Sequence, residues 1–182
     1  MSLLRLDAVA CVRGGRLLFE GLSLTLGPGE AALVSGPNGI GKSSLLRLAA
    51  GLLRPASGHV ERSGTALADE HLALDERQRL DRALGLWVTD AAIGMGAMGI
   101  DPLAAVPVRM LSTGQRKRAA LARVIASDAP LWLLDEPANG LDADGLDRLA
   151  AAMAGHRAGG GAILAASHQA LDLPGAKPVA LG

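Results

Sequence analysis

Hydrophobic and polar residues alternate with a period of two over much of the first thirty positions. Residues 3–12 read LLRLDAVACV, with apolar residues mostly on one side, and residues 22–26 read LSLTL, which is strict alternation. A shorter run at 17–19 starts another strand, and turns are expected at 14–15 and 27–29. The pattern therefore predicts antiparallel strands ahead of the rest of the chain.

Further along, short apolar runs alternate with segments of helical periodicity. Three runs have the length of buried strands: residues 31–34, 130–134 and 162–166. Three segments have the spacing of helices: residues 44–50, 113–127 and 142–156. One more strand is expected at 59–62 and an edge strand within 173–181. Such alternation is typical of an α/β domain built on a parallel sheet.

The middle of the chain departs from this alternation. Residues 70–87 are polar and rich in Arg, Asp and Leu, and residues 91–110 are rich in Ala, Met and Gly. We expect a helix in the first stretch and one or two short helices in the second. The chain is therefore predicted to form a single domain over residues 1–182, with a helical subdomain inserted at about 70–127.

Composition limits the classes of function. Lys plus Arg and Asp plus Glu number 18 each among 182 residues, so no net charge draws the chain to nucleic acid or anionic lipid. The most apolar stretch, 91–111, contains charged residues and prolines, and we expect no membrane span and no secretory signal. Cys11 is the one cysteine, which excludes an internal disulfide and an all-cysteine metal site. We expect a cytoplasmic protein that would reach a membrane through a partner.

The segment after the first buried apolar run carries the clearest chemistry. Residues 36–43 read GPNGIGKS and match G-x-x-x-x-G-K-[ST] at each fixed position, between an expected strand and an expected helix. Backbone N–H groups of such a loop surround phosphate oxygens, while Lys42 contacts the β- and γ-phosphates and Ser43 binds Mg²⁺. The candidate nucleotide-binding residues are Gly36, Pro37, Asn38, Gly39, Ile40, Gly41, Lys42, Ser43 and Ser44. The alternative is a Gly-rich turn that binds nothing.

Two acidic residues follow the next buried run. Asp135 and Glu136 come directly after the apolar residues LWLL. A parallel strand carries its carboxyl end to the ligand crevice, so Asp135 is expected to hold Mg²⁺, usually through water. Glu136 is then placed to act as a general base toward a water that attacks the γ-phosphate. A surface turn is the alternative, and the phosphate loop upstream favours the site.

Residues 111–115 read LSTGQ and introduce a predicted helix. Ser112 is a good N-cap, so its hydroxyl and the first N–H groups of the helix form a second candidate anion site. A simple helix cap is the alternative, and the residues alone leave both interpretations open.

LSTGQ, the phosphate loop upstream and LLDEP downstream together resemble the ATP-binding-cassette (ABC) ATPases. The resemblance covers nearly the whole chain. It implies an α/β P-loop NTPase fold with a RecA-like, mostly parallel sheet, an antiparallel β subdomain and a small helical subdomain. In that family two chains form a head-to-tail homodimer with ATP, which places the LSTGQ residues of one chain, Ser112, Gly114 and Gln115, at the nucleotide of the other.

The resemblance extends to two further segments. Residues 139–142 resemble the D-loop, which makes Asp142 a candidate nucleotide-binding residue, and His168 resembles the switch histidine. The resemblance implies that His168 stabilises the γ-phosphate end, beside the catalytic residues Lys42 and Glu136.

Within this family the sequence is most similar to the ATP-binding subunits of haem exporters in bacterial cytochrome c maturation. The shared segments include GPNGIGKSSLLRLAAGLLRPASG and PVRMLSTGQRKRAALARV. This resemblance implies ATP and Mg²⁺ as cofactors, an integral membrane permease subunit (CcmB-like) as partner, and a place on the cytoplasmic side of the bacterial inner membrane. Another cargo, a soluble cassette of the translation or DNA-repair type, and a regulatory module with little turnover stay open as alternatives.

Two positions differ from the family pattern. Many cassettes place an aromatic residue under the adenine, where this chain offers Arg13, whose guanidinium can stack on a base. The glutamine that senses Mg²⁺ and the membrane partner is missing from its usual place, where His71 falls, and Gln78 is the only nearby glutamine. A neutral imidazole can accept a hydrogen bond from a metal-bound water, so His71 is a candidate metal-site residue.

Overall fold

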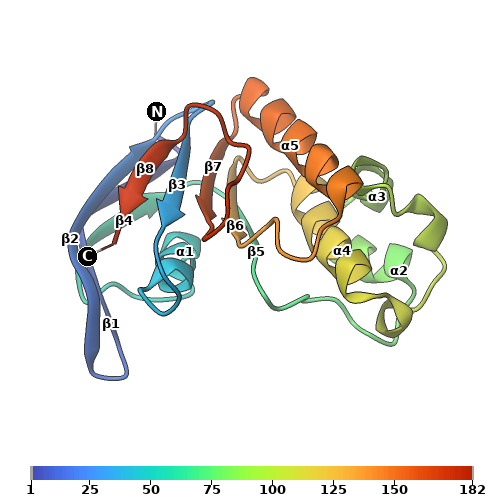
Figure 1. Cartoon of the computed structure of the whole chain (residues 1–182), viewed down its shortest axis with the longest axis horizontal. Helices are drawn as coiled ribbons and strands as arrows, with labels where there is room; N and C mark the ends of the chain where they lie inside the picture. The colour runs from blue at the N-terminus through green and yellow to red at the C-terminus, as the bar shows by residue number, and fades with distance from the viewer. Residues whose placement is uncertain (1, 182) are drawn as a thin grey trace.

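Two sheets and a group of helices make up the computed structural model, which describes residues 2–181 (Figure 1). The smaller sheet is antiparallel, with the strand order β2-β1-β4. Its strands are β1 (Leu4–Arg13), β2 (Arg16–Leu26) and β4 (Ser57–Arg62). The predicted antiparallel strands are confirmed. Residues 17–19 and 22–26 form one strand rather than two, because pairing with β1 continues through a bulge between them.

The larger sheet is parallel, with the strand order β5-β6-β7-β3-β8. Its strands are β3 (Ala31–Ser35), β5 (Thr65–Ala68), β6 (Leu131–Asp135), β7 (Ala162–Ala166) and β8 (Lys177–Ala180). Every neighbouring pair is parallel, so the carboxyl ends of all five strands gather at one edge. The loop after β3 and the end of β6 therefore meet at this edge, with only β7 between the two strands.

Five α-helices accompany the sheets in the described part of the chain: α1 (Lys42–Ala50), α2 (Leu80–Gly85), α3 (Ala91–Met98), α4 (Thr113–Ile125) and α5 (Ala143–Ala158). Two short 3₁₀ turns lie between α3 and α4, at Asp101–Leu103 and Val108–Met110. Figure 1 shows α1 beside the antiparallel sheet, and α2 to α5 on the other side of the parallel sheet. Within residues 2–181 no helix has the length and hydropathy needed to cross a bilayer.

The parallel sheet separates two hydrophobic cores. Alternate residues of a strand point to opposite faces. On β6, Leu131 and Leu133 pack in the core that holds α1 and the antiparallel sheet, whereas Trp132 and Leu134 pack in the core that holds α3, α4 and α5. Burial on both faces explains why these strands appear in the sequence as continuous apolar runs.

The stretch 70–87 does not form the expected helix, because only Leu80–Gly85 is helical. Asp69 and Asp75 each accept a hydrogen bond from the backbone N–H two residues further on, at 3.0 and 2.9 Å. Such bonds satisfy the backbone in turn conformations and compete with a helix. The chain just before this stretch forms β5, which we did not predict, because the sequence TALA is too short and alanine-rich to stand out as a strand.

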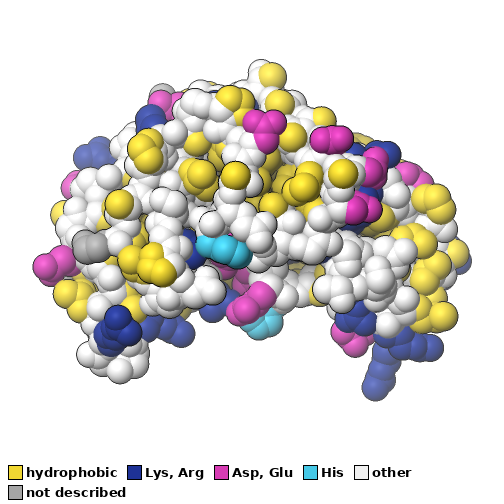
Figure 2. Space-filling view, viewed as in Figure 1, with side chains coloured by type: hydrophobic (Ala, Val, Ile, Leu, Met, Phe, Trp, Pro, Cys, Tyr) yellow, Lys and Arg dark blue, Asp and Glu magenta, His cyan; other side chains and the backbone are white. Residues whose placement is uncertain are grey.

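Figure 2 shows the surface on the same side of the molecule as Figure 1. Acidic and basic side chains are interspersed over this face. The lower edge is hollowed between the lobe of the antiparallel sheet and the lobe of α2 to α4. The surface is therefore divided into two lobes, and each lobe contains one of the two hydrophobic cores.

Candidate functional site

The predicted phosphate loop connects β3 to α1. Gly41 is the N-cap of α1 and has a φ of 117°, a conformation that favours glycine. A Cβ atom at this position would lie 3.2 Å from side-chain atoms of Leu18 and Phe19, so close packing also requires glycine here. No side chain caps α1, which leaves its first N–H groups available to an anion.

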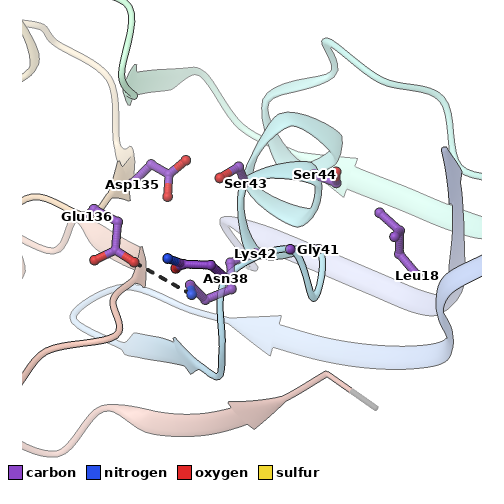
Figure 3. Close-up of a pocket in the computed structure, with 9 residues that line it drawn as sticks. Leu18, Asn38, Gly41, Lys42, Ser43, Ser44, Asp135 and Glu136 are labelled. Atoms are coloured by element: carbon purple, nitrogen blue, oxygen red, sulfur yellow. Dashed lines mark ion pairs between the residues drawn. The ribbon is translucent and has the colours of Figure 1, made fainter. Parts of the chain in front are cut away.

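A cavity of about 210 Å³ lies at this loop (Figure 3). Its lining residues are Leu18, Asn38, Gly39, Gly41, Lys42, Ser43, Ser44, Asp135 and Glu136. Figure 3 shows the side chains of Ser43 and Asp135 facing each other, with Lys42 turned toward Glu136. The cavity thus brings together most of the predicted phosphate-loop residues and both acidic residues that follow the apolar run of β6.

Lys42 provides a buried positive charge in this cavity and is only 6% exposed. Its Nζ atom donates hydrogen bonds to the carbonyl oxygens of Gly36 at 2.7 Å and Pro37 at 3.3 Å. It also lies 3.6 Å from Oε1 of Glu136. The loop carbonyls therefore hold the ammonium group beside the open N–H groups of α1, an arrangement that suits a phosphate.

Ile40 packs its side chain away from the cavity, against the core that holds α1. A Cβ atom at Gly36 would lie 3.3 Å from Cγ2 of Ile40, so the loop closes tightly around this residue. Ile40 therefore anchors the loop to the core, and the carbonyls of Gly36 and Pro37 accept hydrogen bonds from Lys42. Asn38, Gly39 and Ser44 line the cavity.

Asp135 ends β6, and the side chain is almost fully buried. Burial raises the pKa of this carboxyl above its ordinary value, although a hydrogen bond from Ser43 and the charge of Lys117 act against the rise. The Oδ1 atom is buried without a hydrogen-bond partner among the described residues. An unpartnered carboxylate oxygen beside a serine hydroxyl fits Mg²⁺, which commonly takes one or two carboxylates together with phosphate oxygens.

The protein supplies only part of such a metal site. Within residues 2–181 no group of three or more His, Cys, Asp or Glu side chains is placed to hold a metal ion. Ser43 and Asp135 would therefore share the ion with nucleotide phosphates and water, as is usual for Mg²⁺ at phosphate-binding sites.

The backbone turns sharply at Glu136, which has a positive φ of 45°. A residue other than glycine in this conformation costs about 1–3 kcal/mol and is often found at functional sites. The turn is held by a hydrogen bond from the Glu136 N–H to the carbonyl of Ala166, at 2.8 Å. The hydrogen bond to Ala166, the last residue of β7, therefore fixes the backbone of Glu136 at the edge of the cavity that its side chain lines.

His168 holds the Glu136 carboxylate from the other side. Its backbone N–H donates to Oε2 of Glu136 at 3.2 Å, and its Nδ1 lies 2.9 Å from the same oxygen. Burial raises the pKa of the Glu136 carboxyl, but the bonds from His168 and the charge of Lys42 outweigh burial and hold the pKa below its ordinary value. The carboxylate is thus ionised at neutral pH and able to accept a proton.

The LSTGQ turn forms a second cavity of about 320 Å³ at the start of α4. Its lining residues are Gly99, Ile100, Leu103, Ser112, Gly114, Gln115, Arg118, Gly140 and Asp142. Ser112 Oγ accepts from the Gln115 N–H at 3.3 Å, and Gln115 Oε1 accepts from the Ser112 N–H at 2.9 Å. This capping box leaves the hydroxyl hydrogen of Ser112 free to donate to a ligand.

Asp142 lies in the second cavity but is engaged with its own chain. It caps α5 by accepting from the Gly145 N–H at 3.0 Å, and it pairs with Arg118 of α4. No residue lines both this cavity and the phosphate-loop cavity. The structure therefore brings the predicted residues together in two separate groups rather than in one site.

His71 and Arg13 belong to neither group. The side chain of His71 is 70% exposed and lies beside Asp69, with Nδ1 3.6 Å from Oδ2. Its backbone N–H donates to Asp69, and His71 is not among the residues that line the cavity of Asp135, so its role at the metal site stays a prediction. Arg13 ends β1 at an exposed position, and Leu18 of β2 lines the cavity instead.

Asp69 is an acidic residue beside the end of β6 that the sequence analysis missed. Ala68 pairs with Leu134 in the parallel sheet, so Asp69 follows β5 beside the position that Asp135 takes on β6. Arg47 of α1 lies 3.3 Å from its Oδ2 atom. Asp69 could be identified from the sequence only if the pairing of β5 with β6 were known, and the sequence of β5 does not clearly predict a strand.

The sequence and fold are similar to those of known ATP-binding proteins. A family model described as "ABC transporter" matches residues 19–139. The cytochrome c biogenesis ATP-binding export protein CcmA of Sphingopyxis alaskensis is 58% identical over 99% of this chain and 97% of its own length. The protein of the same name from Zymomonas mobilis is 54% identical, over 95% of this chain and 81% of its length.

Solved structures agree in fold at much lower identity. One described as the ATP binding subunit of an ABC transporter has a TM-score of 0.82, with 22% identity over 91% of this chain and 79% of that chain. At this level of identity the similarity concerns the fold, that is, the arrangement of the sheets and helices.

Proposed function

This chain belongs to the ABC transporter family and is an ATP-hydrolysing subunit related to the cytochrome c biogenesis export proteins. We propose that its ATP hydrolysis powers the export of haem for cytochrome c maturation. The observation that supports hydrolysis most directly is the shared cavity of Lys42, Asp135 and Glu136 at the carboxyl edge of the parallel sheet. Haem as the cargo is supported by the resemblance to haem exporter subunits.

The charged residues of the phosphate-loop cavity have distinct roles in the proposed reaction. Lys42 and the N–H groups of the loop bind the β- and γ-phosphates. Ser43 and Asp135 hold Mg²⁺, which neutralises phosphate charge when bound. Glu136 accepts a proton from the attacking water, and His168 keeps the Glu136 carboxylate in place and lies near the γ-phosphate end.

The second cavity supports a shared site between two chains. Ser112, Gly114 and Gln115 lie at the N-terminal turn of α4 and line the second cavity, which has no lining residue in common with the phosphate-loop cavity. In an ATP-dependent, head-to-tail homodimer this turn would contact the nucleotide held by the partner chain. Asp142 would take part through its link to α4, since its carboxylate pairs with Arg118.

The chain is further proposed to work with an integral membrane permease subunit, CcmB-like, on the cytoplasmic side of the bacterial inner membrane. Leu52 and Trp87 are 65% and 55% exposed, and both line an apolar cavity of about 470 Å³ between α1, β5 and α4. Exposed apolar groups at a cavity of this kind favour a protein contact. A helical subdomain at about 70–127 would present part of this surface. Another cargo with the same machinery is the alternative.

Glu136→Gln tests the proposed hydrolysis. Glutamine keeps the shape of the side chain but cannot accept the proton, so ATP turnover should fall by about 10²- to 10⁴-fold while ATP binding persists. Glu61→Gln is the matched control, because Glu61 lies on β4 with its side chain 59% exposed. Steady-state ATPase activity and binding of a fluorescent ATP analogue separate the two effects. Unchanged turnover in Glu136→Gln would remove Glu136 from the mechanism.

Ser112→Arg tests the shared site. The bulky cation should prevent two chains from closing on ATP, while nucleotide binding at the phosphate loop stays nearly intact. Ser57→Arg, at an exposed position of β4, controls for the added charge. Sedimentation with ATP, with Ser112→Arg placed in the Glu136→Gln background, measures dimer formation, and ATPase activity is measured for Ser112→Arg alone. Dimer formation in the first experiment together with full hydrolysis in the second would contradict the shared site. Identification of the membrane protein and cargo that co-purify tests the transport assignment.

A further inference from the structure

The phosphate-loop cavity has two chemically different ends (Figure 3). Asp135 and Glu136 lie at one end, where the proposed reaction places Mg²⁺ and the attacking water beside the γ-phosphate. Leu18 of β2 lies at the opposite end, beyond Gly41 and Ser44. A nucleoside triphosphate with its γ-phosphate at Glu136 therefore directs its ribose and base toward Leu18 and the hairpin that β2 forms with β1.

The end of this hairpin has a fixed geometry. Gly14 and Gly15 connect the two strands and have φ values of 56° and 75°, as a two-residue type I′ turn requires. Arg13 of β1 and Arg16 of β2 flank the turn and lie directly opposite each other in the strand register. The turn therefore makes the two arginine side chains cross-strand neighbours.

Both arginines lie on the side of the hairpin that faces the phosphate loop. Cys11 and Arg13 are two residues apart on β1, and alternate residues of a strand share a face. Cys11 is buried in the core that holds α1, and its cross-strand partner Phe19 would lie 3.2 Å from a Cβ atom at Gly41. Arg13, and with it Arg16, is therefore on the face of the hairpin next to the loop.

Two like charges face each other at this end of the hairpin. Within residues 2–181 neither Arg13 nor Arg16 has an ion-pair partner, whereas Arg5, also on β1, pairs with Asp7 at 3.5 Å. Like charges directly opposite each other on neighbouring strands destabilise a sheet. Figure 2 shows basic side chains at the lower left, where Figure 1 places the end of the hairpin. An electron-rich ligand beside the two guanidinium groups would relieve their repulsion.

The hairpin offers hydrogen-bond donors to a base but no side-chain acceptor. Residues 12–19 read VRGGRLLF, in which the only polar side chains are the two guanidinium groups. Guanine presents two neighbouring acceptors, O6 and N7, which match the paired donors of an arginine. Adenine presents the N7 acceptor beside the N6 amino group, so one arginine donor would face another donor. The side chains of the hairpin therefore fit guanine better than adenine.

We propose that this chain hydrolyses GTP as well as ATP, and that Arg13 and Arg16 select guanine by donating hydrogen bonds to its O6 and N7 atoms. The reaction is the one proposed for ATP. The water oxygen bonds to the γ-phosphorus, the bond from this phosphorus to the β–γ bridging oxygen breaks, and a proton of the water passes to Glu136 and then to solvent, which yields GDP and phosphate. This inference rests on the proposed hydrolytic site, whose phosphate loop binds groups that both nucleotides share.

Nucleotides that differ at one position of the base test this selection in the purified full chain. ITP carries the O6 and N7 acceptors of guanine without its 2-amino group, and 7-deaza-GTP lacks the N7 acceptor. The kcat/KM values for GTP and ITP should be equal to or above the value for ATP, or at most about threefold below it. The value for 7-deaza-GTP should be roughly threefold or more below that for GTP, because half of a bidentate contact is lost.

A preference for ATP over GTP of more than about threefold in kcat/KM would overturn the proposal, and so would equal values for GTP and 7-deaza-GTP. Absence of hydrolysis with every nucleotide would contradict the proposed function instead. Base selection is then measured by competition of GTP and ATP against a fluorescent nucleotide without Mg²⁺, where tighter binding of ATP would refute the selection of guanine.

Substitution of both arginines assigns the selection to the hairpin. The double variant Arg13→Met, Arg16→Met removes the donors and keeps unbranched side chains at both positions. Its kcat/KM for GTP should fall roughly fivefold or more, mainly through KM because the base does not touch the reacting phosphorus, while the value for ATP changes by about twofold or less. Arg5→Met is the matched control on β1 and should change neither value, since Arg5 pairs with Asp7. Equal losses for the two nucleotides in the double variant would point to contacts with phosphate and would overturn the selection of guanine by the hairpin.

Discussion

Gly94 of α3 lies at the crossing with α4, and alanine at this position tests how closely the two helices must approach. A Cβ atom at Gly94 would lie 2.0 Å from the carbonyl oxygen of Ala122, 2.7 Å from its carbonyl carbon and 3.0 Å from its Cα. These neighbours are backbone atoms, so no side-chain rotation can relieve the contact. The two helices would have to separate by about 1 Å, which disturbs the packing of both.

The expected size of the effect is the balance of two terms. Overpacking at a buried contact costs about 1–3 kcal/mol. Alanine in a helix interior is favoured over glycine by about 0.5–1 kcal/mol. Subtracting the second term from the first leaves a net loss of about 0–2.5 kcal/mol. The 2.0 Å approach to backbone atoms favours the upper half of this range, which corresponds to a melting temperature lower by roughly 2–10 °C for a domain of this size.

Gly96→Ala is the matched control on the same helix. The nearest atom to a Cβ at Gly96 is Oδ1 of Asp101, at 3.4 Å, a side-chain atom at an ordinary contact distance. This variant gains helix propensity without the clash and should melt at the same temperature or slightly higher. Thermal unfolding followed by far-UV circular dichroism compares the two. A Gly94→Ala variant that melts as high as Gly96→Ala would refute the close-approach argument.

Three further changes have clear expected outcomes. Gly41→Ala should abolish nucleotide binding, measured by titration with a fluorescent ATP analogue, because a Cβ would contact Leu18 while the left-handed backbone is strained. His156 stacks on Trp132 with ring centroids 3.8 Å apart, and burial lowers its pKa, so the free energy of unfolding should fall as pH drops below about 6.5, where the unfolded histidine takes up a proton. His156→Phe should flatten this fall in urea titrations at several pH values, and an unchanged pH dependence would exclude His156 as its source. Trp87→Ser should weaken co-purification with the permease while the ATPase activity of the isolated subunit stays the same, and full co-purification would exclude the Trp87 surface as the contact.

The phosphate loop, the acidic pair and the LSTGQ cap could all be predicted from the sequence. Each depends on a few consecutive residues whose backbone geometry is local. A glycine at position 41 allows the left-handed turn into α1, and Ser112 with Gln115 three residues later forms a capping box. The continuous apolar runs likewise indicated the buried parallel strands, because burial on both faces removes the polar positions.

The contacts between these local units were decided by the tertiary structure. Asp69 lies beside the end of β6 because the four-residue strand β5 pairs with β6. Leu18 of β2, and not Arg13 of β1, is among the residues that line the phosphate-loop cavity. Lys117 reaches Asp135 only through the packing of α4 against the parallel sheet. Local periodicity does not encode which strands become neighbours or how helices dock, since these depend on close packing between segments far apart in the chain. For the same reason His71, placed at the metal site by sequence spacing, lies exposed on a loop whose path follows Asp69.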